Sequence, residues 1–357
     1  MTITEELETL RGEPIEVFTG DPMDIPCIEI SDSEKLCKHP VVSVHIITYN
    51  HEPYIRQAIE GVMMQKTDFE FELVIGEDCS QDKTREICFE YQKKYPEKIR
   101  VLWWHENVSK LGGNSRRVSA HCRGEFIAYC EGDDYWIDPL KLQKQVDYMR
   151  ETDSVMCVAS SEWHYPNGKI KKKIYRPERG LLSLADFLHH YFHTTTYVVN
   201  RSVYAACQRR YAEIIIWYDL VITACMSTMG RVCYLPDIVS VYRWTGNGIT
   251  GSKRSEKREM MVAFQLTQFS YCSNEKIAAY YTPLAIRKLT KGVAFGSTND
   301  GHRYSSDVRK RALLTARRLW RNHYPTKSEK LLDLSCIKLS FLGWICAIMR
   351  RMKHMWK

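Results

Sequence analysis

The strongest constraint on the fold is an alternation of short apolar runs with stretches of helical spacing in the first half of the chain. Residues 41–47, 71–75, 99–103 and 126–130 are apolar runs of strand length. Between them, as in residues 54–63, apolar side chains recur every three to four positions. Strands that alternate with helices predict an α/β fold with a mostly parallel, Rossmann-like sheet flanked by helices. Ligands of such sheets bind beyond the carboxyl ends of the strands.

Three loops that follow predicted strands are rich in polar residues. They cover residues 48–52, 76–82 and 131–136. The third places three carboxylates, Glu131, Asp133 and Asp134, within four residues. Left unpaired, these groups would repel one another, and a divalent cation with oxygen ligands would relieve the repulsion and could hold a diphosphate. The alternative is that Asp133 and Asp134 cap a helix that follows them.

The three loops and their strands occur in a recognisable order. Residues 43–50 read Ser-Val-His-Ile-Ile-Thr-Tyr-Asn, residues 77–84 read Glu-Asp-Cys-Ser-Gln-Asp-Lys-Thr, and residues 131–139 read Glu-Gly-Asp-Asp-Tyr-Trp-Ile-Asp-Pro. Over about residues 41–250 this order resembles the inverting glycosyltransferases of family two, of the bacterial glycan-biosynthesis type, which have the GT-A fold.

The resemblance implies a GT-A-like fold with a C-terminal helical extension, and a transferase activity. A hexosyl or N-acetylhexosaminyl group would move from a nucleotide-sugar, with a UDP-sugar favoured, to a glycan or lipid-linked saccharide. The reaction would invert the anomeric carbon and would need Mn²⁺ or Mg²⁺ as cofactor.

The resemblance also implies a set of nucleotide-binding residues: Thr48, Tyr49, Asn50, Glu52, Asp78, Asn107, Arg116, Glu131 and Gly132. Thr48 and Tyr49 would line the nucleobase pocket, and Asp78 would hydrogen-bond the base. Glu131 would face the ribose, although the family more often has Asp at this position. Asp133 would coordinate the metal.

A second set would contact the donor sugar or the acceptor: Asp134, Trp136, His193 and Thr194. Asp134 would face the donor sugar or support the metal. Trp136 is expected to stack on a sugar, whereas Trp103 and Trp104 are expected to pack against the sheet. Asp219 begins a helix-like stretch and matches the family's catalytic carboxylate, so it would take the proton of the acceptor hydroxyl. The segment around Asp219 matches the family loosely.

Two further groups have interpretations that the sequence leaves open. His189, His190 and His193 could bind zinc on a helix face, or they are ordinary residues of one amphipathic helix. Lys169, Lys171, Lys172 and Lys173 follow a turn signal at residues 166–168. These lysines could bind an anionic acceptor, or they could belong to an exposed hairpin.

Charge is distributed unevenly, which suggests how the chain is organised. Residues 1–40 hold ten acids against three bases, and residues 301–357 hold fourteen Lys or Arg against three acids. We expect a loosely ordered extension over residues 1–38, the catalytic domain over 39–250 and a helical region over 251–330. Residues 331–357 are expected to form a basic amphipathic helix, too short in its apolar part to span a bilayer, that lies on a membrane surface. The alternative is a helix docked on the catalytic domain or on a second subunit.

The sequence also bears on cellular location. Residues 1–12 lack the apolar core of a signal peptide, and no apolar run has the length of a transmembrane helix. The thirteen cysteines include no CxxC pair and are expected to be reduced. We therefore expect a cytoplasmic protein, with peripheral contact to the inner face of the membrane through the tail.

Three other functions remain as alternatives. A nucleotidyltransferase would need a Gly-rich basic loop after the first strand, which residues 48–51 do not provide. A non-catalytic nucleotide-sugar-binding scaffold on the same fold is opposed by the intact Asp133–Asp134 pair. A nucleic-acid binder is suggested by the basic tail alone, and the acidic loops argue against it.

Overall fold

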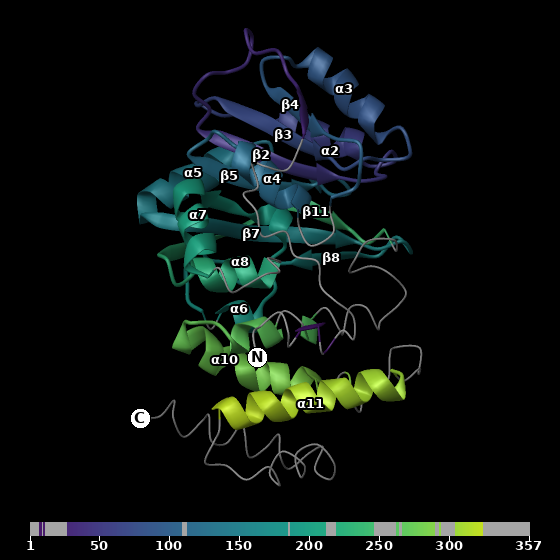
Figure 1. The fold of residues 1–357 in the computed structure, drawn as a ribbon. Helices are drawn as coiled ribbons and strands as arrows, with labels where there is room; N and C mark the ends of the chain where they lie inside the picture. The colour runs from purple at the N-terminus through teal and green to yellow at the C-terminus, as the bar shows by residue number, and fades with distance from the viewer. Residues whose placement is uncertain are drawn as a thin grey trace. The chain divides into compact units, whose positions relative to one another are not determined.

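The computed structural model describes two compact units of the chain. One unit comprises Glu16–Gly251, and the other comprises Met1–Ile15 together with Ser252–Lys357. Figure 1 shows their helices and strands. The described residues are Leu7, Glu8, Leu10, 27–108, 113–184, 186–211, 219–245, 262–263, 266–289, Val293 and 304–323.

The described part of the larger unit is built on an 11-stranded mixed sheet. The strand order is β1-β4-β3-β2-β5-β10-β7-β11-β6, with β8 paired to β7 and β9 paired to β11. The strands are β1 (Ile28–Ile30), β2 (Val42–Thr48), β3 (Phe71–Glu77), β4 (Ile99–Trp103), β5 (Phe126–Glu131), β6 (Tyr135–Trp136), β7 (Ser154–His164), β8 (Ile170–Lys173), β9 (Gly180–Leu182), β10 (Val198–Asn200) and β11 (Arg231–Arg243).

The parallel part of the sheet is the part that the sequence predicts. Strands β4, β3, β2 and β5 are parallel neighbours. Strand β10 lies antiparallel between β5 and β7, and β11 runs parallel to β7. The mostly parallel α/β sheet is therefore confirmed, and antiparallel strands join it at β1, β6, β8, β9 and β10.

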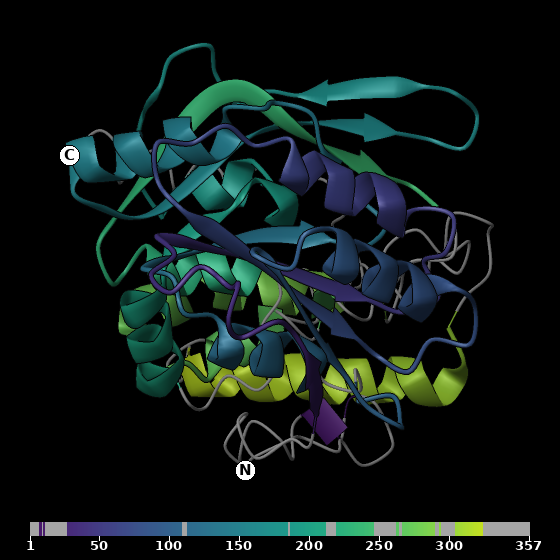
Figure 2. The same ribbon diagram turned by 90° about the horizontal axis from the view of Figure 1, so that it is seen from above.

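Helices lie on both sides of this sheet (Figures 1 and 2). The helices of this unit are α2 (Ile55–Met63), α3 (Thr84–Lys94), α4 (Gly113–His121), α5 (Lys141–Thr152), α6 (Asp186–His189), α7 (Arg201–Arg210) and α8 (Asp219–Met226). Helices α2, α3 and α5 bury their apolar faces against alternate residues of β2 to β5 in one continuous core. Because helices cover both of its faces, the parallel sheet needs the near-continuous Val and Ile runs seen in the sequence.

Helix α2 approaches the chain around β6 unusually closely. A Cβ atom added at Gly61 would lie 2.9 Å from the backbone nitrogen and oxygen of Trp136. Only glycine therefore fits at this position. The contact fixes the loop after β5 against the helix after β2, and both of these segments follow strands whose ends carry polar residues.

The opposite face of the sheet holds a buried ionic network around Glu72 of β3. Its Oε1 accepts a hydrogen bond of 2.6 Å from the Ser43 hydroxyl. Its Oε2 lies 2.6 Å from Nη2 of Arg123 and 3.3 Å from Nη1 of Arg100. Arg100 also pairs with Glu29 of β1 at 2.8 Å. The network therefore connects β1, β2, β3 and β4 to the segment that enters β5.

The smaller unit is helical where it is described. It contains α10 (Glu275–Arg287) and α11 (Ser306–His323). The rings of Phe269 and Tyr281 stack with centroids 4.2 Å apart, and the His323 ring lies 2.8 Å from the carbonyl oxygen of Ser270. No helix in the described ranges combines the length and the apolar character needed to cross a bilayer.

The predicted terminal segments are described only in part. Residues 28–30 of the predicted N-terminal extension form β1, which pairs with β4. The predicted amphipathic helix over residues 331–357 lies outside the described residues. Its contact with a membrane, a second subunit or the catalytic domain stays a prediction.

The ionic network gives a prediction about stability. Replacing Glu72 by Ala (Glu72→Ala) leaves Arg100 and Arg123 without their buried partner, and breaking a buried ion pair in this way costs about 3–5 kcal/mol. The matched control is Glu90→Ala, which breaks an exposed pair with Arg56 (side chains 59% and 49% exposed) and should leave the free energy of unfolding close to that of the wild type. Urea unfolding of the two variants measures both values, and equal losses would contradict the assigned role of Glu72.

Candidate active site

Three polar loops meet at the carboxyl ends of β2, β3 and β5. The backbone N–H of Asp78, just after β3, donates to the carbonyl of Thr48 at 3.0 Å. The N–H of Gly132, just after β5, donates to the carbonyl of Ile47 at 3.0 Å. Parallel pairing thus brings the three motifs of the sequence to one edge of the sheet.

The loops after β2 and β3 are tied together by their own side chains. Oδ1 of Asn50 accepts from the N–H of Gln81 at 2.7 Å, and Oε2 of Glu52 accepts from the N–H of Lys83 at 3.1 Å. Asn50 has a positive φ of 53°, a conformation that Asn tolerates better than most residues. Asn50 and Glu52, predicted to bind the nucleotide, therefore also hold the two loops in shape.

Thr48 and His51 pack closely against Gly132. A Cβ at Gly132 would lie 2.7 Å from both Oγ1 of Thr48 and Nδ1 of His51. Those two atoms are buried and have no hydrogen-bond partner among the described residues. Tyr49, next to Thr48, keeps 40% of its surface exposed. This edge therefore offers an accessible aromatic ring beside unsatisfied polar atoms.

Asp78 is fully buried and organises the neighbouring loop. Its Oδ1 accepts from the N–H of Val108 at 2.8 Å, and its carbonyl accepts from Nδ2 of Asn107 at 3.1 Å. Arg116 lies on α4. Burial raises the pKa of Tyr204 on α7, and the charge of Arg116 partly offsets this effect. Asp78 and Asn107 are thus brought together, and Arg116 lies within electrostatic range of Tyr204 on α7.

The acidic motif after β5 is crowded. Burial, and then the charges of Asp133 and Asp219, raise the pKa of Glu131 to about 8. Oε1 of Glu131 accepts a hydrogen bond of 3.3 Å from the Thr194 hydroxyl. Asp133 is partly exposed, so its carboxylate has access to solvent.

Asp134 is the buried member of the motif. Its Oδ1 accepts from the backbone N–H of Arg243 at 2.7 Å. Its Oδ2 is buried, has no hydrogen bond within the described ranges and lies 3.8 Å from Nδ1 of His193. Burial, and then the Asp133 charge, raise the pKa of Asp134 well above its usual range.

Asp219 is the first residue of α8, and its charge contributes to the raised pKa of Glu131. The Tyr191 hydroxyl donates a hydrogen bond to its Oδ2. Burial raises the pKa of Asp219 to about 6, although hydrogen bonds from Tyr191 and from the backbone act in the opposite direction. The structure therefore places Asp219, the predicted catalytic carboxylate, near the acidic motif, although the two are far apart in the sequence.

The turn over Thr194–Thr196 lies between these carboxylates and the core. Trp136 donates from its indole N–H to the carbonyl of Thr195 at 3.0 Å and is only 1% exposed. Trp136 therefore supports the turn from within the core, and its buried ring is not available to stack on a sugar. His193 packs against Tyr242 with ring centroids 4.4 Å apart and an interplanar angle of 39°, and burial lowers its pKa to about 3. His193 is therefore neutral at physiological pH.

The structure adds two site residues that the sequence reasoning missed. Tyr191 contacts Asp219, yet in the sequence it stands among histidines without a distinctive spacing. Arg243 ends β11, and its Nη1 donates to the carbonyl of Asp133 at 2.8 Å while its guanidinium lies 4.2 Å from the Tyr135 ring centre. In the sequence, the only signal that could have identified Arg243 as a site residue is its position at the end of a strand. In the structure, that strand end lies next to the acidic motif.

His190 and His193 show no metal-site geometry, and the side chain of His189 lies outside the described part of the structure. The ring of His190 packs against Tyr175 and Phe192, with centroids 5.1 Å and 4.7 Å away. No group of three His, Cys, Asp or Glu side chains that could hold a metal ion by themselves is found in the described part of the chain.

The acidic motif nevertheless suits a metal that is shared with a ligand. Mg²⁺ commonly binds through one or two carboxylates and completes its shell with phosphate oxygens and water. Asp133 supplies a carboxylate with access to solvent. Burial, and then the charges of Asp133 and Asp219, raise the pKa of Glu131, and a cation would offset those charges. The residues present therefore fit a divalent cation held jointly with a diphosphate.

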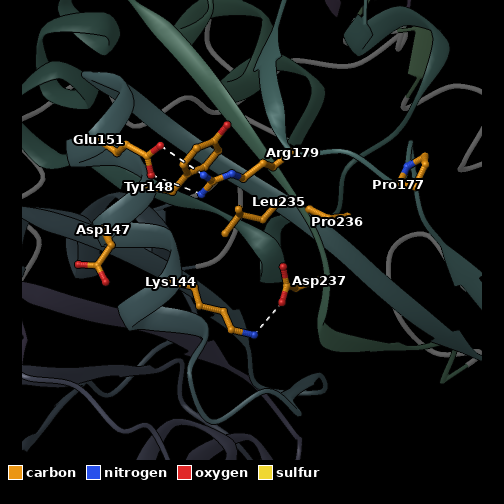
Figure 3. Close-up of a pocket in the computed structure, with 9 residues that line it drawn as sticks. All are labelled: Lys144, Asp147, Tyr148, Glu151, Pro177, Arg179, Leu235, Pro236 and Asp237. Carbon is orange, nitrogen blue, oxygen red and sulfur yellow. Dashed lines mark hydrogen bonds and ion pairs between the residues drawn. The ribbon is translucent and has the colours of Figure 1, made fainter.

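A separate pocket of about 470 Å³ lies between α5 and β11 (Figure 3). Its charged groups pair with one another: Arg179 with Glu151 at 3.3 Å, and Lys144 with Asp237 at 2.6 Å. None of the predicted site residues lines this pocket. It is therefore distinct from the loops at the ends of the parallel strands.

Comparison with known proteins agrees with this geometry. Residues 43–209 match the family model described as glycosyl transferase family 2. An uncharacterized protein of Mycobacterium tuberculosis (strain H37Rv) is 36% identical over 227 residues, which cover 61% of this chain and 63% of that protein. TuaG of Bacillus subtilis, a putative teichuronic acid biosynthesis glycosyltransferase, is 24% identical over 70% of this chain and 97% of its own length.

Two solved structures share the fold. One is S. aureus TarS 1–349 in complex with UDP-GlcNAc, with a TM-score of 0.52 and 18% identity over 83% of this chain and 79% of that one. The other is the mannosyltransferase PcManGT from Pyrobaculum calidifontis in complex with GDP-Man and Mn²⁺, with a TM-score of 0.50 and 15% identity over 98% of this chain and 90% of that one. Residues 43–209 therefore match glycosyl transferase family 2, and the larger unit has the GT-A fold.

Proposed function

We propose that the protein transfers a sugar from a nucleotide-sugar to a hydroxyl of a glycan or lipid-linked saccharide, with a divalent cation and with inversion. The observation that carries the proposal is the convergence of Asp219 with Glu131 and Asp133 at the carboxyl ends of the parallel strands. A UDP-sugar is the favoured donor, and a hexose or N-acetylhexosamine the favoured group.

The donor would bind across the three loops. Tyr49 would stack on the base, Asp78 would face the base, and Glu131 would face the ribose. Asp133 would hold the cation against the diphosphate. A bound Mn²⁺ or Mg²⁺ would supply positive charge that offsets the charge left on the departing nucleotide.

Asp219 would act as the general base. The acceptor oxygen forms a bond to the anomeric carbon, the bond from that carbon to the diphosphate breaks, and the acceptor proton passes to Asp219. A positioned base of this kind contributes about 10²–10⁴-fold to the rate. Tyr191 would orient the carboxylate and, as a hydrogen-bond donor, lower its pKa.

The relatives support these assignments by analogy. TuaG is named as a glycosyltransferase and aligns over nearly its whole length, and the two solved structures contain nucleotide-sugars, one of them with Mn²⁺. The chain spans 63% of the length of the mycobacterial relative. Peripheral contact with the inner face of the membrane through residues 331–357 belongs to the same proposal.

The metal assignment can be tested on the donor alone. Wild type should release nucleotide from one of a panel of UDP-, GDP- and dTDP-sugars with Mn²⁺ or Mg²⁺, and EDTA should abolish the release. Asp133→Ala should lose about 100-fold or more, because charge stabilisation at a leaving group is usually a large contribution. Asp147→Ala removes an exposed carboxylate of α5 and should keep wild-type release. Normal release by Asp133→Ala would contradict the metal assignment.

The pKa of Asp219 predicts the pH dependence. A base must be ionised, so kcat/KM should rise with pH and level off above about pH 6. Tyr191→Phe removes a hydrogen bond that favours the ionised form, and it should therefore move this rise to higher pH. Tyr95→Phe, on the loop after α3, is the control and should leave the profile in place. An unshifted profile in Tyr191→Phe would show that Asp219 is not the group that titrates.

A further inference from the structure

A row of aromatic rings leads away from the candidate base. Tyr191, whose hydroxyl bonds to Asp219, lies 5.9 Å from Trp163 of β7 between ring centroids. Trp163 lies 6.4 Å from Trp244, and Trp244 stacks on Tyr165 at 5.6 Å with an interplanar angle of 26°. These four residues are called the aromatic strip below.

The strip is held by the pairing of β7 and β11. Trp163 lies opposite Tyr242 in these parallel strands, and their rings are 5.1 Å apart. The N–H of Trp244 donates to the carbonyl of His164 at 2.8 Å, which continues the pairing beyond the end of β11. A rigid two-strand support therefore fixes the spacing of the rings.

The strip is not part of the apolar core. Tyr191 is 44% exposed, and Trp163, Tyr165 and Trp244 are half-buried. The indole N–H of Trp163 is buried and has no hydrogen-bond partner in the part of the chain that the structure describes. Aromatic rings that remain accessible beside the candidate base are suited to bind a ligand.

Strand β8 adds positive charge to the same face. Lys171 pairs with Trp163 and Lys173 with Ser161 in the antiparallel register of β7 and β8, so both lysines share the face of Trp163. Nζ of Lys173 lies 4.3 Å from the centre of the Trp163 ring. Lys172 points to the other face, where it approaches Glu162 at 4.0 Å.

We propose that the aromatic strip, with Lys171 and Lys173, is an acceptor subsite for an anionic saccharide. Sugar rings would stack on Trp163 and Trp244, since the apolar faces of a pyranose suit the electron-rich face of an aromatic ring. A carboxylate or phosphate of the saccharide would lie at the lysines, while Tyr191 joins the strip to Asp219. This inference rests on the proposed transferase function and names its acceptor class.

The test is binding of the purified full chain to an array of bacterial glycans that includes uronic-acid, phosphate-bearing and neutral oligosaccharides. Wild type should prefer acidic glycans, and binding should weaken with salt. The relative signal of the carboxylate and phosphate members identifies the anion. Binding confined to neutral glycans, or to none, would overturn the proposal.

Two adjacent lysines provide a matched pair of variants. Lys171→Glu should weaken binding to acidic glycans by about tenfold, because it places a negative charge on the face of the strip. Lys172→Glu makes the same change in charge on the opposite face and should stay within about twofold of wild type. Equal effects of the two variants would show that only net charge matters and would overturn the subsite.

The stacking surface is tested separately. Trp244→Ala should lower binding by about tenfold. Thermal unfolding identifies a variant that fails to fold, and Trp244→Phe, which keeps a ring, should then restore most of the binding. Retained binding in a folded Trp244→Ala variant would contradict the strip. Nucleotide release by wild type tests the proposed function independently, so a transferase with a neutral acceptor is distinguished from a chain without transferase activity.

Discussion

The crowding of carboxylates at one edge of the sheet is the constraint on which the site depends. Glu131, Asp133, Asp134 and Asp219 influence one another electrostatically, and burial raises the pKa of Glu131, Asp134 and Asp219. Burying like charges is unfavourable unless other groups compensate. The protein compensates in part, through the Thr194 and Tyr191 hydroxyls and the N–H of Arg243. In the proposed mechanism, a cation that arrives with a diphosphate would offset the remaining negative charge.

The sequence predicts the parts of this arrangement that depend on local pattern. Runs of Val and Ile separated by helical spacing predict parallel strands, and parallel strands bring the loops after β2, β3 and β5 to one edge. Contacts that depend on distant pairing could not be predicted in the same way. Arg243 reaches the acidic motif at the end of β11, whose pairing with β7 includes register shifts around Leu235, Ile238 and Ser240. Tyr191, in the segment between α6 and β10, contacts Asp219 across 28 positions of the sequence. Trp136 was expected on the surface of the site, but its indole reaches back to Thr195 and is buried.

Within the larger unit, the residues assigned to the nucleotide and those assigned to the acceptor lie in different places. The loops after β2, β3 and β5 carry the residues assigned to the nucleotide, and they are fixed by short hydrogen bonds such as Asn50 to Gln81. The aromatic strip and its lysines lie on or near β7, β8 and β11. Tyr191 is common to both regions through its contact with Asp219. Acceptor choice could therefore change with the strip while the donor loops stay the same.

The proposed mechanism requires the acidic motif to hold a metal only together with a nucleotide diphosphate. Calorimetric titration of Mn²⁺ into the wild-type chain, alone and with UDP, GDP or dTDP, measures this dependence. Metal binding to the chain alone should be weak, and the affinity should increase clearly with one of the nucleotides, since no three His, Cys, Asp or Glu side chains in the described ranges form a metal site by themselves. The increase should be absent in Asp133→Ala. Equal metal binding with and without every nucleotide would show that the acidic motif does not hold the metal jointly with a diphosphate.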